Sequence, residues 1–201
     1  MLIGSQRSPI VRGFVFDGDS HTYGNADPAN AWPNFLHTQP RALPYILSNI
    51  ATNGATWGSV SNRYAAFAYP LSPAGRGVPC GYWLHIGSNN IAIGDSGASI
   101  YAGAAAILAR AKADGFDPIG VTQPWGDDNF TSDQNTQLLA YNALLVDDPS
   151  ITPGLIFDGY TIITPFNSAP YHTGGDNHLN PTGQAFYASN VYPLLLGSNR
   201  F

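Results

Sequence analysis

Four short polar segments, far apart in the chain, hold the side chains that could do chemistry. They are residues 17–21 (DGDSH), 53–55 (NGA), 87–90 (GSNN) and 176–178 (DNH). A serine hydroxyl becomes a nucleophile when a histidine takes its proton, and the oxyanion that then forms needs N–H donors held in place. Ser20, His178 and Asn89 are residue types that could fill these three roles.

Apolar, β-favouring runs precede the first three of these segments. We expect strands at Gly13–Phe16, Tyr45–Ile50, Gly81–Ile86, Pro118–Thr122 and Leu155–Phe157, because each run is short and bounded by Gly, Pro, Asp or Asn. Helical spacing predicts helices at Ala29–His37, Ser99–Ala113, Asp133–Val146 and Pro181–Leu195. In the second of these, Ser99 is the expected N-cap and Gly115 the expected stop.

This alternation of strands and helices predicts an α/β fold with a parallel sheet covered on both faces. In such a sheet, ligands bind beyond the carboxyl ends of the strands, where the polar segments are expected to meet. The 201 residues, with 44% hydrophobic content, predict a single domain over residues 1–201.

The charge balance and the cysteine count exclude several classes of partner and site. Lys+Arg 8 against Asp+Glu 13 give a formal net charge of −5, so no broad cationic face for nucleic acid is expected. Cys80 is the only cysteine, which excludes an internal disulfide and a site of several thiolates. No HExxH motif occurs, His37 and His85 are expected to be structural, and no metal site is predicted.

The first residues, up to Pro9, contain no long apolar segment, so neither a signal peptide nor a membrane span is expected in this chain. A leader could have been removed. The near absence of lysine, with 22 Gly and 16 Pro, is a weak indication of a secreted or virion-associated protein. The compartment and the oligomeric state stay open.

The four polar segments, in this order, resemble the sequence blocks of the SGNH hydrolase family, also called GDSL-type esterases. The likeness rests on Gly18-Asp19-Ser20, Gly54, Gly87 with Asn89, and His178, and it spans nearly the whole chain. It implies a flavodoxin-like three-layer α/β/α sandwich of about five mostly parallel strands. It also implies a serine esterase that needs no cofactor.

The resemblance implies a role for each matching residue. Ser20 would be the nucleophile and His178 the general base, with Asp176 as the third member of the triad. The backbone N–H groups of Ser20 and Gly54 and the side chain of Asn89 would form the oxyanion hole. Ser20 would then attack an ester carbonyl and carry the acyl group.

Two positions depart from the family pattern. The third block usually ends in Asp, where this chain has Asn90, a residue without an assigned role. The orienting acid normally lies three residues before the histidine, where this chain has Gly175, and Asp176 lies two before it. A Ser–His pair aided by a backbone carbonyl is therefore the alternative to a full triad.

Three further residues are candidates for substrate binding: His21, Gly87 and Trp125. Trp125 belongs to the polar and aromatic loop at 123–131, and an indole beside polar groups suits a sugar or aryl ring. We therefore expect a small-molecule or glycan ester as substrate, with a short acyl group such as acetyl.

Two other functions stay open on sequence grounds. A non-catalytic ligand- or glycan-binding module could use the same fold. Asp17-Gly18-Asp19 also resembles the first motif of Mg²⁺-dependent haloacid-dehalogenase-type phosphatases. That family's lysine should follow the threonine of a later strand, yet Lys112, the chain's one lysine, precedes Thr122. The esterase is the better interpretation.

Overall fold

Five parallel strands form the centre of the molecule, in the order β2-β1-β3-β4-β5. The computed structural model describes residues 12–25, 27–39, 45–76, 78–123, 130–148, 156–163 and 178–197. The strands are β1 (Arg12–Gly18), β2 (Tyr45–Asn49), β3 (Cys80–His85), β4 (Asp117–Val121) and β5 (Ile156–Phe157). The strand order reverses between β1 and β3, and ligands of doubly wound sheets bind at such a switch point.

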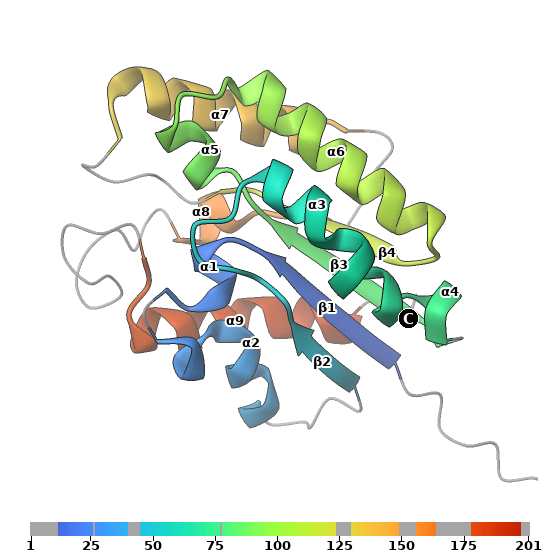
Figure 1. The fold of residues 1–201 in the computed structure, drawn as a ribbon. Helices are drawn as coiled ribbons and strands as arrows, with labels where there is room; N and C mark the ends of the chain where they lie inside the picture. The colour runs from blue at the N-terminus through green and yellow to red at the C-terminus, as the bar shows by residue number, and fades with distance from the viewer. Residues whose placement is uncertain are drawn as a thin grey trace, which may run out of the picture.

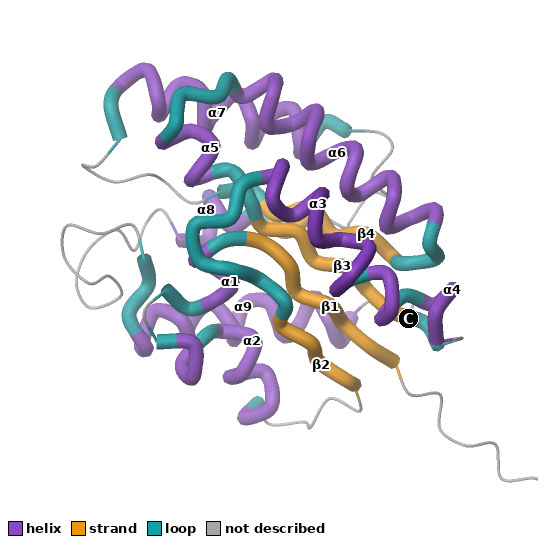
Figure 2. Tube along the Cα trace, viewed as in Figure 1, coloured by secondary structure: helices purple, strands orange, loops and turns teal. Residues whose placement is uncertain are grey.

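Helices cover both faces of the sheet (Figures 1 and 2). One face carries α3 (Trp57–Phe67), α6 (Gly97–Ala113) and α7 (Ser132–Val146), and the other carries α2 (Trp32–Phe35) and α9 (Pro181–Gly197). The short elements are α1 (Ser20–Tyr23), α4 (Pro73–Arg76), α5 (Ser88–Ala92), α8 (Gly159–Ile163) and the 3₁₀ turns η1 (Pro28–Asn30), η2 (Leu36–Thr38) and η3 (Tyr69–Leu71). The predicted α/β class and three-layer arrangement are confirmed.

The core explains why the central strands are continuous apolar runs. Every residue of β3 is buried, since helices lie over both of its faces. Between the sheet and α9, Trp32 packs 5.1 Å from Trp83 and 5.2 Å from Tyr187, measured between ring centroids. This aromatic layer supports the sheet directly beneath the carboxyl end of β3.

The predicted helix at Ala29–His37 is wrong, because the segment divides into η1, α2 and η2. Ala31 is extended (φ −63°, ψ 141°), and Pro33 has no N–H with which to continue an earlier helical turn. The backbone of His37 lies in η2, and its side chain lies outside the described part of the molecule.

The caps of α6 correct one prediction and confirm another. The N-cap is Ser96, whose Oγ accepts a hydrogen bond from Ser99 N at 3.2 Å, so Ser99 lies inside the helix. Gly115 directly follows the C-cap residue, in the left-handed region (φ +87°), as expected of a glycine that ends a helix. In the described parts of the chain, no helix is long and apolar enough to cross a membrane.

Candidate active site

The turn that follows β1 places Ser20 at the carboxyl edge of the sheet. Gly18 has φ +147°, and a Cβ at this position would lie 2.1 Å from the carbonyl oxygen of His85 on β3. Only glycine allows this approach, and Asp19 N then donates a hydrogen bond of 3.0 Å to the same oxygen. Asp19 also caps α1, because its Oδ1 accepts from His21 N at 3.0 Å. Ser20 is therefore the first residue of α1.

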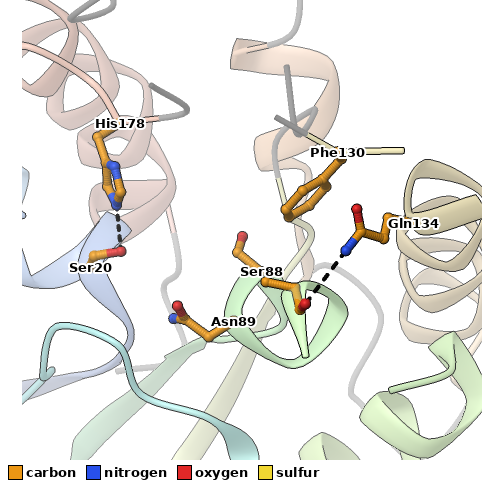
Figure 3. A pocket seen from close by; sticks show the side chains of 7 residues that line it. Ser20, Ser88, Asn89, Phe130, Gln134 and His178 are labelled. Carbon is orange, nitrogen blue, oxygen red and sulfur yellow. Dashed lines mark hydrogen bonds between the residues drawn. The ribbon is translucent and has the colours of Figure 1, made fainter. Parts of the chain in front are cut away.

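His178 lies against Ser20, although the two residues are 158 positions apart. The distance from His178 Nε2 to Ser20 Oγ is 2.6 Å, and Figure 3 shows the ring pointing at the hydroxyl. Asn180 holds the start of α9 through a 3.0 Å hydrogen bond from Gly183 N to its Oδ1. A serine and a histidine in this contact have the geometry in which the imidazole can take the hydroxyl proton.

Gln184 joins α9, the helix that follows His178, to α2, which covers the same face of the sheet. This buried side chain on α9 accepts a hydrogen bond from Trp32 N of α2, at 2.9 Å. His178 thus lies three residues before a helix that is fixed to the protein core.

Asn89, on α5, lines the same pocket as Ser20 and His178. Its Nδ2 donates to Ala55 O at 3.1 Å, which uses one of the two N–H bonds of the amide. Gly54, the neighbour of Ala55, is exposed and has φ +73°. Within the described residues, the backbone N–H groups of Ser20 and Gly54 donate no hydrogen bond. Of the three predicted oxyanion donors, Ser20 at the start of α1 and Asn89 on α5 line the pocket, whereas Gly54 does not.

The pocket has a volume of about 330 Å³ and opens beside the Ser20–His178 pair. Its lining consists of Ser20, Ser88, Asn89, Ala92, Phe130, Gln134 and His178 (Figure 3). Four of these were not singled out from the sequence as substrate contacts: Ser88, Ala92, Phe130 and Gln134. The far wall is therefore made by α5 and the start of α7.

Gln134 shows why the residues of the far pocket wall are difficult to predict from the sequence. It forms a capping box with Thr131, whose N donates to Gln134 Oε1 at 2.9 Å. This T-x-x-Q pattern can be recognised in the sequence as a helix start. The contact of Gln134 Nε2 with Ile91 O, at 3.3 Å, joins α7 to α5 and has no sequence signal.

The structure places the remaining predicted site residues in three kinds of position. Asp176 and Trp125 lie outside the described residues. Gly87 is buried at the turn into α5, where a Cβ would lie 3.1 Å from Gln123 Cγ and 3.2 Å from Tyr141 Cε1, and it does not line the pocket. His21 is buried too, with its ring beside that of His178.

Two buried aspartates support the turn that carries Ser20. Asp17 pairs with Arg63 and accepts a 2.8 Å hydrogen bond from the Tyr82 hydroxyl. Burial raises the pKa of Asp17, and the Arg63 guanidinium acts in the opposite direction. Burial also raises the pKa of Asp19, to about 7. Neither carboxyl group lines the pocket.

Metal-ligating side chains do not gather in the described part of the molecule. There, no group of three or more His, Cys, Asp and Glu residues could hold an ion. His85, the buried histidine of β3, contacts Thr22 instead, with 3.4 Å between its Nδ1 and Thr22 Oγ1. Burial lowers the pKa of His85 to about 3, so this ring is neutral at any ordinary pH.

No protein-family model and no curated protein matches the chain. Solved structures do. A lipolytic protein of the G-D-S-L family from Veillonella parvula aligns with a TM-score of 0.75 at 16% identity, over 95% of this chain and 100% of that chain. The psychrotrophic esterase EstA from Pseudoalteromonas sp. aligns with 0.75 at 11%, over 94% and 99%. The acetyl xylan esterase AlAXEase aligns with 0.69 at 15%, over 90% and 98%.

These likenesses cover nearly the full length of each protein compared. The chain has the fold of the SGNH hydrolases, as the sequence resemblance implies. At these low identities the likeness defines the fold, and an activity depends on the residues of the site.

Proposed function

We propose that this chain is a serine esterase that hydrolyses carboxylic esters through an acyl-enzyme intermediate. The observation that carries the proposal is the 2.6 Å contact between His178 Nε2 and Ser20 Oγ, at the mouth of a pocket. The contact lies at the carboxyl ends of β1 and β3, where this class of sheet places its ligands. The fold shared with esterases supports the same conclusion.

In the first half of the reaction, Ser20 Oγ attacks the ester carbonyl carbon while His178 Nε2 takes the hydroxyl proton. The oxyanion lies among Ser20 N–H, Gly54 N–H and the Asn89 amide, whose second N–H is available for it. His178 then returns the proton to the departing alcohol. The acyl group is left on Ser20.

In the second half, His178 removes a proton from water, which attacks the acyl carbonyl. The tetrahedral intermediate collapses, Ser20 recovers its proton, and the carboxylic acid leaves. His178 must keep its orientation through both halves. We assign that task to Asp176, with a backbone carbonyl as the alternative.

The substrate we propose is an ester with a short acyl group, such as acetyl, carried by a small molecule or a carbohydrate. The pocket of about 330 Å³ has a mixed lining, with Phe130 and Ala92 beside the polar Ser88, Asn89 and Gln134. Such a lining suits a compact, partly polar ester better than a long alkyl chain. Rates for p-nitrophenyl esters of increasing acyl length should decrease beyond butyrate, and a preference for long chains would overturn this part.

The surroundings of Asp17 and Asp19, the two aspartates that a phosphatase would need, argue against the phosphatase alternative. The Asp17 carboxylate is held by Arg63 and Tyr82, and that of Asp19 caps α1. Neither carboxylate lines the pocket. A binding module on this fold remains the competing proposal, and it differs from the esterase in predicting no covalent chemistry at Ser20.

The deciding experiment measures p-nitrophenyl acetate hydrolysis with a chelator present, for the parent, Ser20→Ala and His178→Ala. The exposed Ser99→Ala, which does not line the pocket, is the matched control. We expect turnover in the parent and the control and none in the other two. Equal background rates in all four proteins would sink the esterase and favour the binding module.

A further inference from the structure

The ring of His21 lies face to face with that of His178. Their centroids are 5.2 Å apart and the ring planes meet at 25°. The His21 ring also lies 5.4 Å from that of His85, at 32°. His21 directly follows Ser20 and is only 5% exposed, so it is part of the protein interior next to the Ser20–His178 pair.

Hydrogen bonds hold both the backbone and the ring of His21. Its backbone N–H donates to Asp19 Oδ1, which holds the residue in the first turn of α1. Its Nε2 lies 3.2 Å from Ser88 Oγ on α5. Ser88 Oγ donates in turn to Gln123 Oε1 at 2.7 Å, which leaves the Ser88 oxygen to accept from His21 Nε2–H.

Gln123, the last member of this chain of bonds, is itself immobilised at the end of β4. Its backbone N–H donates to Asn142 Oδ1 at 2.8 Å, and its carbonyl accepts from Asn142 Nδ2 at 2.9 Å. The His21 ring is thus connected to α5, β4 and α7. A ring held in this way is a rigid surface for whatever packs on it.

We propose that His21 is a positioning residue for His178: its stacked ring holds the imidazole in the plane that faces Ser20. The proposal rests on the proposed esterase function. Rotation of a general base away from its partner removes the near-attack geometry on which its rate depends. A flat aromatic face on one side of His178 excludes such rotations, and it remains favourable when that ring gains the proton of Ser20.

The test separates the ring of His21 from its hydrogen bond. His21→Phe keeps an aromatic face without the donor, His21→Gln keeps a donor without the ring, and His21→Leu keeps neither. With p-nitrophenyl acetate, we expect kcat to fall about tenfold in the Leu and Gln variants with KM within about twofold of the parent. The Phe variant should recover most of kcat.

Two catalytic results would overturn the proposal. One is equal kcat in the Leu variant and the parent. The other is a Phe variant that is as slow as the Leu variant while both unfold at the parent's temperature. In that case an aromatic ring at position 21 would have no advantage over an aliphatic side chain. Thermal unfolding of each variant is therefore recorded beside the kinetics.

A measurement without substrate distinguishes failure of this proposal from failure of the esterase. In ¹⁵N spectra of labelled histidine side chains, the His178 ring should give one sharp set of signals in the parent and the Phe variant, and broadened signals in the Leu variant. Unchanged His178 signals in the Leu variant would refute the positioning role. An inactive parent with these expected spectra would refute the esterase and leave the positioning of His178 supported.

Discussion

The carboxyl and amino ends of β1 and β3 differ in what is buried there. At the carboxyl end, Asp17, Asp19, Ser20 and His85 are polar and buried, and a pocket of about 330 Å³ opens beside them. At the amino end, a cavity of about 10 Å³ is lined by residues that include Gly13 and Cys80. The same two strands therefore end in buried polar groups beside a pocket on one side and in close packing on the other. If the polar end performs the proposed chemistry, a substitution should affect mainly the reaction at that end and mainly stability at the other.

The largest effect that tests this separation is expected from Ser20→Ala. Turnover should fall at least about 10⁴-fold, because Ser20 Oγ lies 2.6 Å from His178 Nε2, whereas the Ser88 hydroxyl, 3.2 Å from His21 Nε2, donates its proton to Gln123 Oε1. The unfolding midpoint in urea should stay close to that of the parent. A variant that kept its activity would place the nucleophile elsewhere.

Asn89→Ala is expected to have the next largest effect. Removal of one oxyanion donor should lower kcat by about 10²- to 10³-fold, or about 3–4 kcal/mol of transition-state stabilisation. The loss of the 3.1 Å bond to Ala55 O should cost stability only about 1 kcal/mol. Steady-state kinetics and urea unfolding of the same preparation check both numbers. Full activity in this variant would remove Asn89 from the oxyanion hole.

Asp19→Asn should raise the free energy of unfolding at alkaline pH. This result would show that a buried carboxyl group at the polar end of the strands lowers the stability of the fold. The pKa of Asp19 is about 7 in the folded chain, against an ordinary value of 3.8, because burial disfavours the charged form. As pH rises from 4 to 7, the unfolded chain loses this proton first, so the folded state is progressively destabilised, by up to about 4 kcal/mol. Asparagine stays neutral and can still cap α1.

The expected result is a free energy of unfolding that is higher for Asp19→Asn than for the parent at pH 8 and equal to it near pH 4. Asp147→Asn, which removes an exposed carboxyl group from the same protein, is the matched control. A difference that did not change with pH would mean that Asp19 carries no proton-linked strain.

Cys80→Ala should give the smallest effect, at the opposite end of the strands. This buried side chain lies 3.0 Å from where a Cβ of Gly13 would be, and its removal leaves a small void. We expect a loss of about 1 kcal/mol in urea unfolding with unchanged esterase rate. A large loss of rate would show that the two ends are coupled.

The strands and the meeting of Ser20 with His178 were predictable from the sequence, for a common physical reason. Short apolar runs ending in polar residues mark buried parallel strands, and polar residues at their ends gather at one edge. Ser20 and His178 needed only this rule and the resemblance to a family. Their 2.6 Å contact follows from the edge on which both lie.

Features that depend on contacts between elements were not predictable. α3 was missed because its sequence, WGSVSNRYAAF, mixes polar and apolar residues and has only Val60 and Tyr64 buried. Phe130 and Gln134 reach the pocket through the docking of α7 on α5, and the helix pattern does not encode that distance. The stacking of His21 on His178 likewise requires α1 to meet the segment that precedes α9.

Because Ser20 and His178 are 158 residues apart, the two halves of the site are synthesised at different times. The turn with Ser20 emerges from the ribosome early, and β1 obtains its central partner β3 only about sixty residues later. The imidazole arrives with α9, whose Gln184 fastens it to Trp32 of an element made long before. A nascent chain therefore holds an unreactive hydroxyl until its last described helix docks, and ester turnover would report completed folding.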